Sequence, residues 1–154
     1  MEYIYCLDTN FFIELWNKHY SPEMFIDFWD KLIDIAKDKK CYIPIQVYEE
    51  IIQIDDNVEK YIKRNKDFFV CSYTEEIESN LSSLYQDEYT YNLIDNKKLK
   101  NYADIFVLAY AKHYNSIVVT FDGKLINCCK NHNIEYIYPY DFIKKNNFKF
   151  IVQN

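Results

Sequence analysis

Two aspartates stand where a parallel sheet would place chemically active side chains. Asp8 follows the apolar run 3–7, and Asp122 follows the run 117–120. In open parallel sheets, binding and catalytic groups gather beyond the carboxyl ends of the strands. An aspartate in such a place also caps helices and forms turns. Taken one at a time, Asp8 and Asp122 therefore leave a functional and a structural interpretation open.

A third acidic residue, Asp104, lies in an almost wholly apolar segment. On the helix expected over 103–113 it projects between Val107 and Leu108. A carboxylate on this face costs several kcal/mol unless a cation or a hydrogen-bond donor meets it. The structural alternative is an N-cap or first-turn residue that the helix dipole favours. The position of Asp104 agrees with both interpretations.

The fourth acidic position belongs to the pair Glu49 and Glu50. On the helix expected over 44–54, Glu50 flanks the apolar stripe that contains Val47 and Ile51, whereas Glu49 lies on the opposite face. We therefore expect Glu50 to point into a cleft at the edge of the core and Glu49 to face water. The alternative is that both are solvated surface charges.

The elements that must position these acids alternate between strands and helices. Strands are expected over 3–7, 41–43, 69–71, 116–120 and 134–137. Helices are expected over 11–16, 22–38, 44–54, 58–68, 74–84, 103–113 and 125–131, and from Pro139 onward, with a polar loop over 86–101. Ser21 and Thr74 are expected to act as N-caps. This alternation predicts an α/β domain with a mostly parallel sheet.

Composition excludes several classes of protein. The chain has 154 residues, of which 49% are hydrophobic and 27% charged, as expected for one globular domain over 1–154. Its single glycine, Gly123, cannot build a phosphate-binding loop or a nucleophile elbow. No apolar run is long enough to span a membrane. Five cysteines without a C-x-x-C pair indicate buried free thiols and a cytoplasmic protein.

Four short motifs, in this order, resemble the PIN-domain nucleases, the fold of the VapC-type ribonuclease toxins in prokaryotic toxin–antitoxin pairs. They are Leu-Asp-Thr-Asn at 7–10, Val-Tyr-Glu-Glu-Ile at 47–51, Ala-Asp-Ile-Phe-Val-Leu-Ala-Tyr-Ala at 103–111 and Val-Val-Thr-Phe-Asp at 118–122. The resemblance covers nearly the whole chain and points to a less-studied branch of these domains. It implies a three-layer fold with helices flanking the central sheet, a homodimer and an antitoxin protein as partner.

The resemblance also implies a metal-dependent endoribonuclease that hydrolyses phosphodiester bonds with a metal-activated water. An all-oxygen ligand set suits Mg²⁺ or Mn²⁺ better than zinc. We expect Asp8 and Asp104 to be the principal metal ligands. Glu50 and Asp122 are then further ligands, or they hold and deprotonate the attacking water. Three neighbouring polar residues are expected to orient these groups from behind, namely Thr9, Asn10 and Thr120.

One departure from the family pattern concerns the number of metals. Many members carry a further acidic residue where this chain has Lys124, which leaves open whether one or two ions bind. Lys124 is expected to hold a substrate phosphate instead, together with Lys97, Lys98 and Lys100. The alternative is that these lysines are only a solvated surface. The alternative function is a catalytically weak or inactive PIN-like domain kept as a protein-interaction module.

Overall fold

A parallel sheet organises the structure, which is a computed structural model that describes residues 3–54, 56–88, 90 and 103–148. Within these residues the sheet has five strands in the order β3-β2-β1-β4-β5, and all neighbours are parallel. The strands are β1 (Tyr5–Leu7), β2 (Cys41–Pro44), β3 (Val70–Cys71), β4 (Ile117–Val119) and β5 (Tyr136–Ile137). The expected α/β architecture is confirmed, and its sheet is wholly parallel.

The direction of strand order reverses at β1. From β1 the chain builds β2 and β3 on one side and then β4 and β5 on the other. Such a reversal opens a crevice beyond the carboxyl ends of the two strands that meet there. Leu7 and Val119, the last residues of β1 and β4, are partners in the ladder. The residues that follow them, Asp8 and Thr120, therefore leave the sheet side by side.

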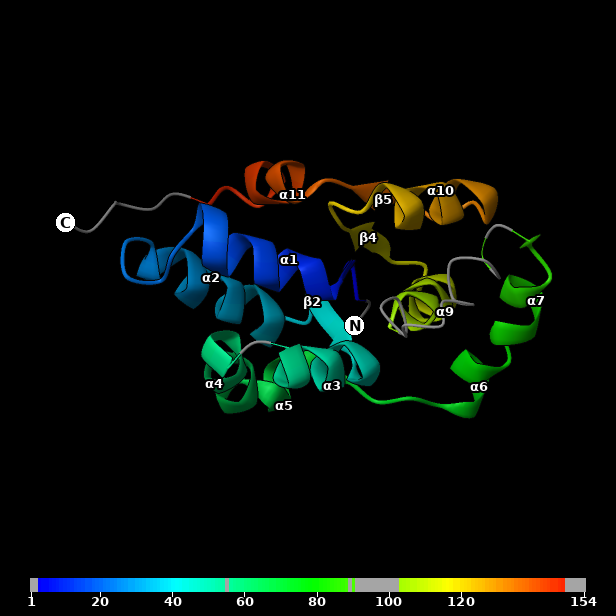
Figure 1. Cartoon of the computed structure of the whole chain (residues 1–154), viewed down its shortest axis with the longest axis horizontal. Helices are drawn as coiled ribbons and strands as arrows, with labels where there is room; N and C mark the ends of the chain where they lie inside the picture. The colour runs from blue at the N-terminus through cyan, green and yellow to red at the C-terminus, as the bar shows by residue number, and fades with distance from the viewer. Residues whose placement is uncertain (1–2, 55, 89, 91–102, 149–154) are drawn as a thin grey trace.

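Helices flank the sheet on both sides, which gives the expected three layers. They are α1 (Thr9–Glu14), the π-helical turn η1 (Leu15–His19), α2 (Ile26–Lys37), α3 (Ile45–Ile54), α4 (Asp56–Arg64), α5 (Lys66–Phe69), α6 (Glu75–Glu78), α7 (Leu81–Tyr85), α9 (Asp104–Tyr114), α10 (Gly123–Asn131) and α11 (Pro139–Lys145). Figure 1 shows α10, β5 and α11 along one side of the molecule and α3, α4 and α5 along the other. No helix in the described part of the chain has the length and apolar character needed to cross a membrane.

The two faces of the sheet are buried by different helices. Tyr42 of β2 packs against α9, where the centroid of its ring lies 5.5 Å from that of Tyr114. The preceding residue, Cys41, faces the opposite side of the sheet, where Tyr61 of α4 lies. Burial raises the pKa of Tyr61 most, and the charge of Cys41 raises it further. Burial on both faces explains why the strands are apolar runs without alternation. All five cysteines are buried free thiols, as expected.

Packing between helices moves the start of the second helix. It begins at Ile26, later than expected, and Ser21 does not cap it with its side chain. The carbonyl of Ser21 instead accepts a bond from the backbone N–H of Phe25 and closes a turn. This turn lets the ring of Tyr20 stack on Phe28, with centroids 4.7 Å apart and planes 11° apart.

Other boundaries differ for local reasons. Pro44 ends β2 and does not open α3, because it pairs with Cys71 of β3. The helices expected over 58–68 and 74–84 are each split in two, as α4 with α5 and α6 with α7. Thr74 caps α6 as predicted, accepting the backbone N–H of Ile77 at 3.3 Å. Most of the loop expected over 86–101 lies outside the described residues.

Candidate active site at the carboxyl edge of the sheet

Asp8 is the most deeply buried of the four acids, at the end of β1. Its Oδ1 accepts the backbone N–H of Phe11 at 2.8 Å, which caps α1, and its Oδ2 accepts the hydroxyl of Thr120. Burial raises the pKa of Asp8 to about 7, although both hydrogen bonds lower it, and the charges of Asp122 and Glu50 raise it further. Without a cation this carboxyl is therefore close to half-ionised at neutral pH.

Thr120 joins two of the acids through one hydroxyl. It is fully buried, donates to Asp8 and accepts the backbone N–H of Asp122 at 3.0 Å. The carboxylate of Asp122 in turn accepts the backbone N–H of Lys124 at 2.8 Å and so caps α10. The expected orienting role of Thr120 thus has a geometric basis, since it determines how Asp8 and Asp122 stand relative to each other.

Glu50 is half-buried on α3, whereas Glu49 is exposed, which confirms the orientation expected from the helical wheel. Burial raises the pKa of Glu50, and hydrogen bonds to the side chain of Thr9 and the backbone of Ala103 lower it. These contacts connect α3 to the starts of α1 and α9. Thr9 therefore touches a site carboxylate, whereas Asn10 is exposed and bonds to none of the four acids in the described part of the structure.

Asp104 is the first residue of α9. Because Ala103 takes the N-cap position, the capping alternative does not hold, although the favourable first-turn position does. Its Oδ2 is buried and has no hydrogen-bond partner among the described residues. Burial raises the pKa of Asp104 well above its ordinary value, and the charges of Asp8, Asp122 and Glu50 raise it further. Such a carboxylate is costly unless a cation meets it.

The four acids are neighbours, and none of them has an ion-pair partner in the described part of the chain. Within the described residues, the ion pairs engage Glu14, Glu59 and Asp87, and none reaches these acids. The same residues contain no group of three or more His, Cys, Asp or Glu side chains closed tightly enough to hold a metal ion. Mg²⁺ keeps several waters and needs only one or two protein carboxylates, so it does not require such a closed group. The buried Oδ2 of Asp104, which lacks a partner among the described residues, and the purely carboxylate donors of this cluster fit a hard divalent cation.

Gln46 is a neighbour of the site that the sequence analysis missed. It is buried on α3, and its Oε1 has no hydrogen-bond partner in the described part of the chain, like Oδ2 of Asp104. Residues four apart share a helix face, so Gln46 lies one turn before Glu50 on the same side of α3. That spacing was the signal that would have found it. Gln46 adds a neutral oxygen acceptor to this face.

The lysines expected to bind phosphate are only partly placed. Lys124 is exposed in the first turn of α10, two residues after Asp122. Lys97, Lys98 and Lys100 lie outside the described residues.

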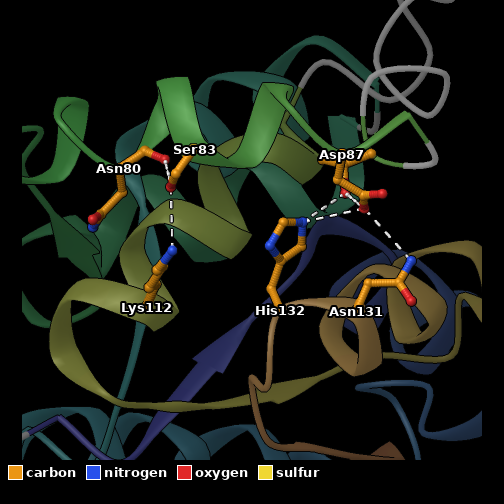
Figure 2. A network of polar contacts seen from close by, with 7 residues as sticks. Asn80, Ser83, Asp87, Lys112, Asn131 and His132 are labelled. Carbon is orange, nitrogen blue, oxygen red and sulfur yellow. Dashed lines mark hydrogen bonds and ion pairs between the residues drawn. The ribbon is translucent and has the colours of Figure 1, made fainter.

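A second polar cluster links Asp87 and Thr90 to the end of α10. Figure 2 shows His132, just after α10, facing Asp87, with Nε2 and Oδ2 3.3 Å apart. The hydroxyl of Thr90 donates to Asp87 at 2.8 Å and lies 3.0 Å from Nε2 of His132. Nearby, Lys112 of α9 donates to the hydroxyl of Ser83 in α7 at 3.2 Å (Figure 2). These contacts join α7 and the turn after it to α9 and α10.

Comparisons with known proteins agree with this architecture. A family described as "Domain of unknown function (DUF4411)" matches residues 5–150. No curated protein matches the chain. A similar solved structure is VapBC2 from Rickettsia felis bound to a DNA fragment from their promoter, at 18% identity and a TM-score of 0.58, covering 88% of this chain and 98% of that one.

Two further structures show the same relationship. FitAcB from Neisseria gonorrhoeae is 13% identical with a TM-score of 0.60, covering 89% of this chain and 99% of that one. VapBC-1 from nontypeable Haemophilus influenzae is 16% identical with a TM-score of 0.58, covering 89% of this chain and 98% of that one. At these identities the similarity establishes the fold, and the PIN-like fold expected from the four motifs is confirmed.

Proposed function

The chain belongs to the DUF4411 family, and on its PIN-like fold we propose that it is a divalent-metal-dependent endoribonuclease. The observation that carries the proposal is the buried Oδ2 of Asp104, which has no hydrogen-bond partner among residues that the structure describes and lies beside three further acids that raise its pKa. An uncompensated cluster of this kind is typical of a site that takes up a cation.

In this proposal Asp8 and Asp104 are the principal ligands of Mg²⁺ or Mn²⁺. When bound, such an ion lowers the pKa of a coordinated water, polarises the scissile phosphate and shields the negative charge of the transition state. Glu50 and Asp122 are further ligands, or they hold the attacking water and accept its proton. The raised pKa of Glu50 suits a general base, since such a base works best with a pKa nearer neutrality.

The remaining side chains hold these groups in place. Thr120 orients Asp8 through its hydroxyl, and Thr9 does the same for Glu50. Residues behind the ligands commonly change activity ten- to a hundredfold when replaced. Lys124 neutralises a substrate phosphate in the first turn of α10, and Lys97, Lys98 and Lys100 are proposed to extend that contact. No nucleophilic side chain is required, because water attacks the phosphodiester.

We also propose association with protein partners, a second copy of the chain and an antitoxin, as the resemblance to toxin–antitoxin nucleases implies. Large apolar side chains remain exposed on several elements, among them Met24, Ile26, Ile54 and Phe68. Exposed apolar surface of this kind commonly marks protein contacts. Light scattering at high micromolar concentration tests the homodimer, and a monomer there removes that part of the proposal.

The decisive experiment compares metal-dependent cleavage of single-stranded RNA by the parent chain, Asp8→Asn and Asp104→Asn. We expect cleavage with Mg²⁺ or Mn²⁺, none with chelator, and at least a hundredfold loss in either variant. Glu49→Gln, purified in the same way, is the matched control because Glu49 is an exposed acid. Cleavage by Asp104→Asn at the parent rate contradicts the proposal. A parent chain that neither cleaves nor responds to metal favours the inactive interaction module.

A further inference from the structure

Three aromatic rings from separate parts of the chain pack together at the surface, and one of them belongs to a chain neighbour of Asp122. His19 is the last residue of η1, Phe121 follows Thr120 after β4, and Tyr140 is in the first turn of α11. We call these three residues the aromatic platform. Each ring contacts the other two, so the platform is a continuous surface built from segments far apart in the sequence.

The platform is ordered by its own contacts. The ring centroids of Phe121 and Tyr140 lie 5.5 Å apart, and those of His19 and Tyr140 lie 5.7 Å apart, both nearly edge to face. The centroid of His19 lies 5.9 Å from that of Phe121, with planes 30° apart. The hydroxyl of Tyr140 is 3.3 Å from Nδ1 of His19. These contacts limit the freedom of side chains that would otherwise rotate on the surface.

Although they pack together, the rings remain accessible. Tyr140 is 50% exposed, His19 is exposed and Phe121 is half-buried. Aromatic side chains normally bury most of their surface in the core or in an interface. The platform therefore presents aromatic surface to solvent, together with a hydroxyl and ring nitrogens.

The position of the platform relates it to the acidic site. Phe121 stands between Thr120, which donates to Asp8, and Asp122, whose backbone N–H bonds back to Thr120. At 1.5 Å per residue, His19 lies roughly 15 Å along α1 and η1 from Thr9. The platform is thus joined to the acidic site through Phe121, while His19 stands at the other end of α1 and η1 from Thr9, which suits a contact for a neighbouring part of an extended substrate.

A local irregularity of the backbone contributes to this arrangement. The α1 helix does not continue regularly but passes into the π turn η1, closed by the bond from the N–H of Tyr20 to the carbonyl of Leu15. A π turn holds more residues than an α turn, so it changes the side of the helix on which His19 emerges. Such turns are rare and occur frequently at functional sites.

We propose that the aromatic platform stacks an unpaired base of a single-stranded RNA whose scissile phosphate lies at the four acids. This inference rests on the proposed nuclease function and adds to it a contact for one base of the substrate. Every base has a π face, so stacking on aromatic side chains tolerates many sequences. Bases inside a duplex are already stacked and paired, and they do not reach such a platform.

The charge of the chain gives stacking a particular importance. The formal net charge is −6 at pH 7, so attraction to the phosphate backbone contributes less than in a basic nucleic-acid-binding protein. Stacking supplies affinity without positive charge. A protein partner is the less favoured occupant, because a stable interface buries about 800 Å² on each side, far more than three rings offer.

The test measures binding with chelator present, so that cleavage does not interfere. The probes are a single-stranded RNA that carries 2-aminopurine, whose fluorescence falls on stacking, and the same sequence as a duplex. We expect the parent chain to quench the single strand and not the duplex. Tyr140→Ala should lower the affinity for RNA roughly tenfold and remove the quench. His19→Ala should reduce both the affinity and the quench. Tyr140→Phe should keep most of the affinity and the quench because it keeps the ring.

The matched control is Tyr138→Ala, since Tyr138 is 48% exposed and makes no ring contact with the platform. It binds as the parent does. Thermal melts establish that every variant folds. With Mg²⁺, Tyr140→Ala raises KM and leaves kcat nearly unchanged, which a general loss of structure would not do.

The outcomes separate this inference from the proposed function. If Tyr140→Ala and His19→Ala bind and quench as the parent does, the platform is not a stacking site. The nuclease proposal is untouched by that result, because the cleavage assay of Asp104→Asn tests it separately. If the parent never cleaves RNA but the quench requires Tyr140, stacking is supported and the nuclease proposal fails. If both variants keep RNA binding but lose self-association by light scattering, the platform is a protein interface and the inference is overturned.

Discussion

The hydroxyl of Thr120 donates a hydrogen bond to Oδ2 of Asp8 across the two strands at which the order of the sheet reverses. The two residues are 112 positions apart, and the pairing of Leu7 with Val119 brings them together. Because Thr120 also accepts the backbone N–H of Asp122, one hydroxyl determines how two acids stand relative to each other.

Replacing Thr120 by valine should therefore damage the site more than replacing it by serine. Valine keeps the volume but leaves an oxygen of Asp8 and the N–H of Asp122 without their partner. We expect cleavage to fall ten- to a hundredfold and stability to fall by about 1–3 kcal/mol. Thr120→Ser retains the hydroxyl and most of the activity. Cleavage assays and urea denaturation measure both effects, and equal activity in the two variants would refute this role.

Asp104→Asn should stabilise the metal-free protein. The substitution replaces a buried carboxyl that is costly to ionise with a neutral amide of nearly the same volume, since the pKa of Asp104 is raised by burial and by the charges of the neighbouring acids. Adding Mn²⁺ to the parent should contribute about 2.7 kcal/mol at a hundred times the dissociation constant, and the variant should lose most of that gain. Thermal melts with chelator and with Mn²⁺ test this, with Glu49→Gln as the control. An Asn variant that is less stable and keeps the full metal response would assign Asp104 a purely structural role.

Glu50→Gln and Glu49→Gln form a pair that tests the orientation of α3. Only Glu50 is turned toward Thr9 and Ala103, whereas Glu49 is exposed. As a ligand or general base, Glu50 should account for about a hundredfold or more in kcat, and Glu49 for almost nothing. Steady-state cleavage of one RNA measures both variants under the same conditions. The opposite ranking would exclude Glu50 from the proposed chemistry.

The stability of the metal-free protein should fall as the pH rises from about 4 to about 7. The pKa of Asp8 is about 7 in the folded chain, against an ordinary value of 3.8, so the folded state holds more protons than the unfolded state in this window. This favourable contribution is complete below the unfolded pKa and is lost as the pH passes the folded pKa. Each unit of difference corresponds to about 1.4 kcal/mol.

Urea denaturation with chelator at several pH values between 4 and 8 measures this dependence. Asp8→Asn should flatten it, because asparagine does not titrate. Comparing the two proteins at each pH cancels the contributions of all other titrating groups. A parent and a variant with parallel profiles would show that the pKa of Asp8 is not raised.

Lys124→Ala should weaken RNA binding to a similar degree for all sequences. Lys124 is exposed in the first turn of α10, where a phosphate contact carries no sequence information. Removing one such contact reduces the slope of log affinity against log salt concentration by roughly 0.7 for a single strand. Fluorescence anisotropy at a series of salt concentrations measures that slope, and an unchanged slope would leave Lys124 as a solvated surface charge.

Some features of this protein depend on short-range sequence patterns alone. Apolar runs of three to five residues predict the parallel strands, since burial on both faces removes the polar alternation. The Thr74 cap and the helix start at Pro139 were also predicted, because both depend on hydrogen bonds or dihedral angles within one turn. Periodicity on α3 distinguished Glu50 from Glu49 for the same reason.

Tertiary structure decided what depends on distant segments. Examples are the bond from Thr120 to Asp8, the aromatic platform, and the buried oxygens of Asp104 and Gln46, which lack a partner within the described ranges. All of them need strands and helices that are far apart in the sequence. The late start of α2 likewise goes with the turn at Ser21 that lets Tyr20 stack on Phe28. Local patterns report dihedral preference and the apolar face of one element, whereas burial, hydrogen-bond satisfaction and pKa shifts depend on which elements pack together. The sequence by itself therefore determined which acids belong to the carboxyl edge of the sheet, and only packing decided how they are held and what they lack.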